Sequence, residues 1–320
     1  MSDVQRRFRF GVLAESVTSA EGLLATARRA EDFGYSTLLL RDHFVTDPFG
    51  AQFAPLVALA VAAAATTRLR VGTLVLDNDY RHPVLLAKEA ATLDALSVGR
   101  FELGIGAGWL RDEYTRAGLP FEAPGVRVGR LEESLRILKG LFAGSPLTFS
   151  GAHYSITDLD SFPRPVQRPH PPILIGAGGQ RMLGLAGREA DIVGILPKAL
   201  PNGTISEDLS ERSAATTERK IDGIRQAAGS RFDRLELSAV ISVTVADDYR
   251  AAAEQVAVDS GWGAAAADLV LDMPSRFVGP VDRIAEQMLA RRDRFGFSYH
   301  VISDTDLDAF APVVGRLAGR

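Results

Sequence analysis

Short apolar runs alternate with longer amphipathic segments along most of the chain. Phe8–Leu13 and Ser36–Leu40 have the length and the apolar content of β-strands. Between them, Ser19–Phe33 places its apolar side chains at the three- and four-residue spacing of one helix face, and Gly34 follows as a helix stop. The same strand–helix pattern then repeats towards the carboxyl end.

This pattern predicts eight strand–helix units. The expected strands are Phe8–Leu13, Ser36–Leu40, Leu69–Leu76, Arg100–Ile105, Pro172–Gly176, Asp191–Leu196, Leu235–Val245 and Tyr299–Ile302. The expected helices cover residues 19–33, 53–66, 83–96, 127–142, 180–188, 213–228, 249–258, 264–271, 281–295 and 307–317. Strands that are apolar on both faces are typical of a parallel sheet covered by helices. We therefore expect an α/β fold, a (β/α)8 TIM barrel, with a doubly wound open sheet plus an appended domain as the structural alternative.

Two irregular segments interrupt the pattern. Residues 143–172 contain six prolines and a Gly-Ala turn, which predicts an excursion such as a hairpin. Residues 197–212 form the second insert. Because no linker-like tract is visible, we expect one domain over residues 1–320, with insertions after the fourth and sixth strands. We also expect the two inserts to build the substrate pocket.

The composition adds mainly exclusions. With 46% hydrophobic and 24% charged residues and no cysteine, the chain is globular and lacks disulfides, thiolate metal sites and a cysteine nucleophile. A net charge of −4 argues against non-specific nucleic-acid binding. The longest apolar run, Ala54–Ala65, is shorter than the ~20 residues of a membrane span, and no signal peptide is visible. We therefore expect a cytoplasmic protein with no nucleic-acid and no membrane partner.

Candidate chemistry lies at the carboxyl ends of the expected strands, where barrel enzymes place their active sites. The second strand runs into Asp42 and His43. One interpretation is a helix-capping aspartate beside a loop histidine. The other is an aspartate that orients an imidazole or binds a heterocyclic ligand, with the histidine as acid or base near neutrality. The residues alone leave both open.

Glycines mark two further strand ends. The fourth strand runs through Gly104–Gly108, which reads GIGAG, into Trp109. These residues fit either close packing or a backbone that lies flat against a planar ring, and the tryptophan is either core or a stacking wall. The fifth strand runs through Gly176–Gly179 into an expected helix that carries Arg181. Free N–H groups at a helix start beside a guanidinium predict a phosphate-sized site, with a flexible turn as the alternative.

Other catalytic motifs are missing from the sequence. No His or carboxylate cluster has metal-ligand spacing, so we expect no metal, and neither a GxSxG elbow nor a phosphate-binding P-loop is present. An aldolase or isomerase barrel is disfavoured, because Lys198 is the only lysine at a clear strand end. Four charged residues lie inside expected strands, and the sequence does not say where they point: Arg9, Arg70, Glu102 and Glu236.

Three segments, in this order, resemble the bacterial-luciferase-like flavin superfamily. They are LLLRDHF at Leu38–Phe44, RHPVLLAKEAATLDALSVGRFELGIGAGW at Arg81–Trp109, and PRPVQRPHPPILIGAGG at Pro163–Gly179. The similarity runs from Phe8 to about Ile302. Within the superfamily the chain looks closest to the actinobacterial branch that uses the deazaflavin coenzyme F420.

The resemblance implies a TIM barrel with the cofactor ring at the carboxyl-end mouth. A non-prolyl cis peptide would lie behind the ring at Leu74-Val75, the Asp42–His43 pair beside it, and the cofactor phosphate at Gly176–Gly179. The implied cofactor-binding residues are Asp42, Leu74, Val75, Gly106, Ala107, Gly108, Gly176, Ala177, Gly178 and Gly179.

Two positions depart from the sugar-phosphate-dehydrogenating relatives. Those relatives carry a glutamate, taken as the catalytic acid, directly after the glycines of the fourth strand, where this chain has Trp109. They also carry a tryptophan shortly after the Asp-His pair, where this chain has Asp47. A glucose-6-phosphate dehydrogenase is therefore not the expected activity.

The sequence thus predicts an oxidoreductase that transfers a hydride between coenzyme F420 and a small organic substrate. His43 is the expected proton-transfer residue, with Asp42 tuning it or binding the ring. The alternatives are an FMN-dependent luciferase-like monooxygenase that uses reduced flavin and oxygen, and a non-catalytic cofactor-binding barrel. A flavin or F420 reductase is the expected partner that supplies the reduced cofactor. The Ala- and Leu-rich segments 53–66 and 83–96 suggest the face of a homodimer.

Overall fold

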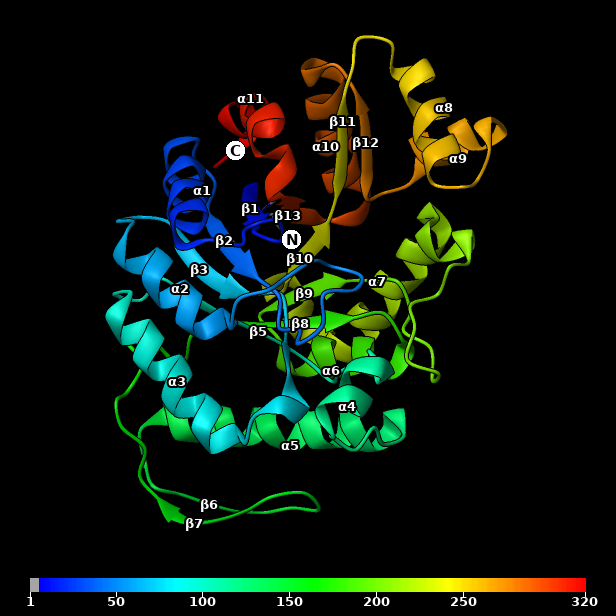
Figure 1. Cartoon of the computed structure of the whole chain (residues 1–320). Helices are drawn as coiled ribbons and strands as arrows, with labels where there is room; N and C mark the ends of the chain where they lie inside the picture. Colours follow the sequence, from blue (N-terminus) through cyan, green and yellow to red (C-terminus); the bar gives the residue numbers. More distant parts are fainter. Residues whose placement is uncertain (1–5) are drawn as a thin grey trace.

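The computed structural model describes residues 6–320 and forms a closed barrel of parallel strands (Figure 1). The strands of the barrel are β1 (Arg9–Leu13), β2 (Thr37–Leu40), β3 (Arg70–Thr73), β4 (Leu76–Asp77), β5 (Phe101–Gly106), β8 (Ile173–Ala177), β9 (Ile192–Ile195), β10 (Glu236–Val240) and β13 (Phe297–Ser303). They follow the order β3-β2-β1-β13-β10-β9-β8-β5-β4, and pairing of β3 with β5 closes the ring. The predicted (β/α)8 barrel is confirmed.

Helices cover the outside of the barrel. They are α1 (Ala20–Asp32), α2 (Pro55–Ala64), α3 (Pro83–Leu96), α4 (Arg111–Ala117), α5 (Pro124–Ala143), α6 (Gln180–Glu189), α7 (Ala214–Ala228), α8 (Tyr249–Asp259), α9 (Ala267–Asp272), α10 (Val281–Phe295) and α11 (Leu307–Leu317). The ends follow local sequence signals: Ser19 caps α1 by accepting the Gly22 N–H, and Gly34 beyond its end has φ +82°. Within residues 6–320 no helix is long and apolar enough to cross a membrane.

The barrel encloses an apolar core. One buried apolar cluster of the strands consists of Leu13, Leu39, Leu74, Leu174, Ile192, Tyr299 and Val301. The opposite face of each strand packs on the surrounding helices in one large apolar cluster. Burial on both faces explains why the strands are apolar throughout.

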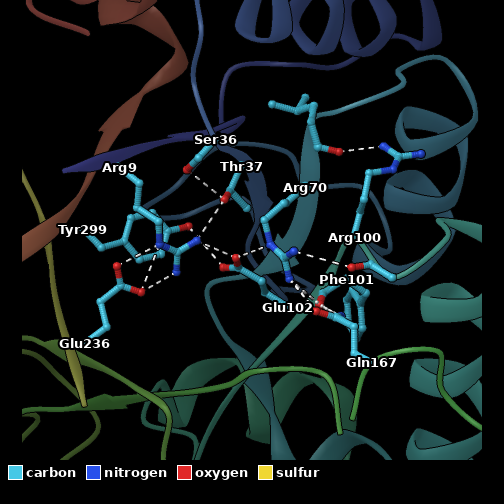
Figure 2. Close-up of polar contacts among 12 residues, drawn as sticks. Arg9, Ser36, Thr37, Arg70, Arg100, Phe101, Glu102, Gln167, Glu236 and Tyr299 are labelled. Carbon is cyan, nitrogen blue, oxygen red and sulfur yellow. Dashed lines mark hydrogen bonds and ion pairs between the residues drawn. The ribbon is translucent and has the colours of Figure 1, made fainter. Parts of the chain in front are cut away.

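The charged strand residues close the amino-terminal end of the barrel, the floor (Figure 2). Glu102, which is 2% exposed, accepts hydrogen bonds from Arg9 at 2.5 Å and Arg70 at 2.6 Å. Arg9 also pairs with Glu236 at 2.7 Å and lies 3.7 Å from the Tyr299 ring centre. Burial alone raises the pKa of Glu102, but the two guanidinium groups outweigh it and hold that pKa below its usual range.

The first insert leads to the floor and away from the mouth. After α5, the antiparallel hairpin of β6 (Leu147–Ser150) and β7 (Ser155–Leu159) projects from the body beneath α3 and α5 (Figure 1). The chain then returns under the barrel, where Gln167 accepts a hydrogen bond from Arg70. The predicted hairpin is therefore confirmed, but no residue of 143–172 lines the mouth cavity. The expectation that both inserts build the pocket is wrong for this one, because α5 runs antiparallel to the strands and ends at the floor.

The seventh strand is also shorter than predicted. It ends at Val240, and the chain leaves the barrel where the Ser242 N–H bonds to the Ser275 carbonyl. β11 (Ser242–Val245) then pairs in parallel with β12 (Arg276–Gly279) outside the barrel. Together with α8 and α9 these strands form a lobe at one side of the molecule, with its own small apolar cluster (Figure 1).

Candidate active site

A cavity of about 1100 Å³ opens at the carboxyl ends of the barrel strands. Every site residue expected from the sequence lines it, with the exception of Ala177. That side chain is buried at 1% exposure, and its carbonyl accepts the Leu196 N–H at 2.9 Å. The structure therefore brings the residues from four separate strand ends together around one cavity.

Asp42 follows β2 and is held as a carboxylate by an arginine. The Arg81 guanidinium binds both of its oxygens, at 2.5 and 3.1 Å. The Asp77 N–H donates a further hydrogen bond to Oδ2 at 3.1 Å. Asp42 caps no helix, so the helix-capping interpretation is excluded for it. No pattern in the sequence singles out Arg81 as the partner of Asp42.

His43 pairs with a glutamate that the sequence reasoning missed. Its Nδ1 lies 2.9 Å from Oε2 of Glu113, on the short helix α4. A carboxylate can only accept, so the proton of a neutral His43 lies on Nδ1 and Nε2 carries the lone pair. No group in residues 6–320 hydrogen-bonds to Nε2. The imidazole is thus oriented with one nitrogen available at the cavity.

Glu113 is buried and fully engaged. Its exposure is 1%, and Oε1 accepts the backbone N–H groups of Phe44 and Val45. Burial raises the pKa of Glu113, but hydrogen bonds from His43, the Phe44 backbone and Tyr80 outweigh burial and lower that pKa overall. Glu113 therefore stays ionised and fixes both the His43 ring and the loop that follows it.

Aromatic rings surround the histidine. The His43 ring centre is 5.0 Å from that of Phe49 and 6.2 Å from that of Trp109, which meets the imidazole at 81°. Trp109 lines the cavity, so it is a wall of the site and not part of the barrel core. Trp109, the residue directly after the glycines of β5, therefore lies beside His43.

A backbone bulge forms one wall of the cavity. The Leu74–Val75 peptide bond is cis, as the resemblance implied, and it divides the predicted third strand into β3 and β4. Glycines allow the neighbouring strand to approach it closely. A Cβ at Gly104 would lie 1.8 Å from the Thr73 carbonyl oxygen, and one at Gly106 would lie 2.9 Å from a Val75 methyl. Gly104 therefore serves close packing, while Gly106 both packs on the bulge and faces the cavity.

The glycine segment after β8 ends at a helix start, as predicted. Gly179 is the N-cap residue of α6, and no side chain accepts a hydrogen bond from the free N–H groups at this helix start. A Cβ at Gly179 would meet nothing within 4 Å, whereas one at Gly178 would lie 2.3 Å from the Pro197 carbonyl oxygen. Arg181 also lines the cavity and, within residues 6–320, has no carboxylate within 4 Å. These features suit an anionic group.

The second insert covers the mouth. Residues 197–207 line the cavity almost continuously and reach across to α4, where Arg111 donates to the carbonyls of Pro201 and Asn202 at 3.1 and 3.2 Å. Lys220 on α7 fixes the start of the insert by donating to the Leu196 carbonyl at 2.8 Å. The expectation that this insert contributes to the pocket is confirmed.

Comparisons with known proteins agree with this architecture. The model of the "luciferase-like monooxygenase" family matches residues 7–299. A glucose-6-phosphate dehydrogenase of Microbacterium testaceum, described as F420-dependent, is 36% identical over 187 residues, which cover 57% of this chain and 55% of that protein. A dimethylsulfone monooxygenase of Pseudomonas putida, described as FMNH2-dependent, is 32% identical over 167 residues, which cover 52% of this chain and 46% of that protein.

A solved structure matches over nearly the whole chain. The coenzyme F420-dependent tetrahydromethanopterin reductase of Methanopyrus kandleri superposes with a TM-score of 0.76 at 18% identity, covering 98% of this chain and 99% of that one. This likeness shows the fold alone, and the alignments to the curated relatives span only about half of their length. The family model, in contrast, covers the barrel from β1 to β13. The chain belongs to the luciferase-like monooxygenase family.

Proposed function

We propose that this protein is an oxidoreductase that transfers a hydride between coenzyme F420 and a small organic substrate. The observation that carries the proposal is the His43–Glu113 pair, which leaves one imidazole nitrogen free in a cavity that the glycine-rich start of α6 also lines. The relatives support the cofactor, because several of the most similar curated proteins are described as F420-dependent.

The residues of the cavity fit a flat, anionic cofactor. The apolar bulge at Leu74-Val75 offers one wall, and the Gly106–Gly108 backbone, which carries only the Ala107 methyl group, offers another. Free N–H groups before α6, with Arg181, would hold the phosphate of the tail. Asp42, fixed by Arg81, would accept a hydrogen bond from a ring N–H. When bound, the deazaflavin would supply the hydride chemistry.

The protein's own task in the reaction is to place a proton. Glu113 keeps the Nδ1 proton of His43 in place, so Nε2 is the atom that takes a proton from, or returns one to, the substrate. Trp109 and Phe49 cover the imidazole and exclude water from that side. In this arrangement Glu113 is a positioning residue and His43 the catalytic one.

The substrate is best sought among small anions. Arg212 and Arg276 both line the cavity, and no carboxylate of residues 6–320 lies within 4 Å of either guanidinium. Burial and the charge of Arg212 lower the pKa of Arg276. Two cations without counter-charges favour a phosphate or carboxylate on the substrate.

The test is oxidation of reduced coenzyme F420, followed by its absorbance, with a panel of aldehydes, ketones and enoates that carry a phosphate or carboxylate. The proposal predicts turnover with at least one of them and a large loss of kcat in His43→Gln. Tight F420 binding without hydride exchange in either direction would favour the non-catalytic barrel. Oxygen consumption with reduced FMN would favour the monooxygenase, which needs a reductase partner and is supported by the dimethylsulfone monooxygenase relative.

We also propose a homodimer formed through α2 and α3. The two helices lie side by side on one flank of the barrel (Figure 1). Their outer faces expose Val57 at 70%, Leu85 at 50% and Leu96 at 71%, apolar side chains that a second copy of the chain would cover. Phe162, at 77% exposure, lies next to α3, where its carbonyl accepts from Lys88.

A further inference from the structure

Four carboxyl groups gather where the ends of β2 and β4 meet α4, and one of them has no basic partner. Asp42 pairs with Arg81 at 2.5 Å, Asp79 with Arg130 at 2.8 Å, and Glu113 with His43 at 2.9 Å. Within residues 6–320 no cation lies within 4 Å of the Asp77 carboxyl group. Asp77 is buried, with 9% of its surface exposed, and it lines the cavity.

The contacts of Asp77 supply few donors for an ionised carboxylate. The Tyr114 hydroxyl oxygen is 2.8 Å from each carboxyl oxygen of Asp77 and 3.2 Å from Oδ2 of Asp79. A phenol has one proton to donate, so it cannot satisfy three carboxylate oxygens. A proton kept on Asp77 eases the shortage, because a neutral carboxyl group needs fewer donors and the phenol can then donate to the oxygens that remain acceptors. The Asp79 N–H supplies one further donor, to Oδ1 at 2.9 Å.

The electrostatics agree with this proton count. Burial raises the pKa of Asp77 to about 7, aided by the neighbouring charges of Asp79 and Asp42, while the hydrogen bonds from the Asp79 backbone and Tyr114 oppose the rise. The groups that face Asp77 from the surrounding elements are Asp42 after β2, Asp79, Tyr80 and Arg81 after β4, Tyr114 and Glu113 on α4, and Arg127 and Arg130 on α5.

The pair lies directly against the glycine backbone of the cavity wall. Gly108 has φ +71°, and a Cβ there would lie 1.9 Å from the Tyr114 oxygen and 2.4 Å from Oδ2 of Asp77. Only glycine fits this position. The Asp77–Tyr114 pair is thus built into the same corner as the bulge and the Asp42 carboxylate.

We propose that Asp77 is the charge-compensating residue of the ring site: it holds a proton while an anionic ring is bound, and it releases this proton when the site is empty at higher pH. The proposal rests on the proposed function, because it needs a ring that accepts and donates a hydride. A neutral ring that accepts a hydride gains one negative charge. Asp42 is balanced by Arg81, and hydrogen bonds hold the pKa of Glu113 below its usual range, so Asp77 is the carboxyl group that can adjust by taking up one proton from solvent.

The experiment measures the affinity for reduced coenzyme F420 under anoxia against pH. In the wild type, binding weakens by up to tenfold per pH unit above about pH 7, because only the protonated Asp77 accepts the anionic ring. Asp77→Asn, which is permanently neutral, lacks this contribution to the pH dependence. The affinity of Asp77→Asn divided by the affinity of the wild type therefore rises with pH. Equal pH dependence in the two proteins would overturn the proposal.

A second variant, Tyr114→Phe, should keep the pH dependence but move it to higher pH. Tyr114→Phe removes a hydrogen bond that lowers the pKa of Asp77, so the loss of affinity moves to higher pH, whereas a purely structural tyrosine would weaken binding equally at every pH. A melting curve of each variant confirms folding, and if Asp77→Asn does not fold, Tyr114→Phe alone decides.

The same titration with reduced FMN separates the two proposals. Binding of FMN but not of F420, with the predicted ratio, overturns the proposed cofactor and supports Asp77. Binding of F420 without a pH-dependent ratio overturns the role of Asp77 and leaves the proposed function standing. Proton uptake on binding, measured well above pH 7 by calorimetry in buffers of different ionisation enthalpy, must be greater by about one proton in the wild type than in Asp77→Asn.

Discussion

Glu113→Gln is expected to reverse the tautomer of His43. The buried Oε1 of Glu113 accepts two backbone N–H groups, so a glutamine keeps its oxygen there and turns its NH2 group towards Nδ1 of His43. That nitrogen must then accept, and the proton moves to Nε2. A hydrogen bond to a charged group contributes about 1.5–3 kcal/mol, which corresponds to a change of about 10- to 150-fold in the tautomer ratio.

The tautomer can be measured without knowing the substrate. The chain has five histidines, so 15N ring labelling gives few signals, and His43→Gln assigns the relevant one. The wild type should show a protonated Nδ1 and a free Nε2 above the titration range, and Glu113→Gln the reverse. Glu113→Asp serves as the control, because it keeps the charge but shortens the reach. Identical ring shifts in the wild type and Glu113→Gln would refute the positioning role.

Three further predictions concern stability and assembly. His300 is fully buried among aromatic rings, both of its nitrogens are unpaired within the described structure, and burial lowers its pKa to about 3. Because the histidine of the unfolded chain binds a proton near pH ~6.5, the free energy of unfolding should fall by about 2 kcal/mol between pH ~7 and pH ~5. His300→Leu should remove this part of the pH dependence of urea unfolding. Glu102→Gln should lower the free energy of unfolding by about 3 kcal/mol at neutral pH, the low end for a broken buried ion pair, because Arg9 retains Glu236. Because the pKa of Glu102 is lowered in the folded protein, this difference from the wild type should shrink as the pH falls towards that pKa. Val57→Glu with Leu85→Glu should convert a dimer into a monomer in sedimentation, whereas Val258→Glu on α8, also exposed, should not; a wild-type monomer would contradict the proposed interface.

The barrel could be predicted because its signal is repeated and local. Each strand is buried on both faces and each helix on one, so apolar periodicity marks the units directly, and the bounds of α3 and α11 agree with the prediction. The end of the seventh strand could not be predicted in this way. The apolar pattern continues through Ile241 into β11, and only the pairing of Ser242 with Ser275 shows that the chain has left the barrel.

The site was only partly predictable, because some of its contacts join residues that are far apart in the sequence. Asp42, His43 and the glycines stand at strand ends, which the barrel brings together. Glu113 lies on α4, a helix of seven mostly polar residues with no apolar face for periodicity to reveal. Its side chain is buried because His43 and two backbone N–H groups surround it, and these contacts span about 70 residues of sequence. Tyr114, the partner of Asp77, lies on the same short helix and could not be predicted for the same reason.

The most direct test of the account is equilibrium binding of the two oxidised cofactors to the purified protein, followed by fluorescence quenching and calorimetry. The account predicts micromolar binding of coenzyme F420 and no measurable binding of FMN, with affinity reduced by Arg181→Ala, which removes the unpaired guanidinium beside the helix start. Binding of FMN in place of F420 would contradict the central claim.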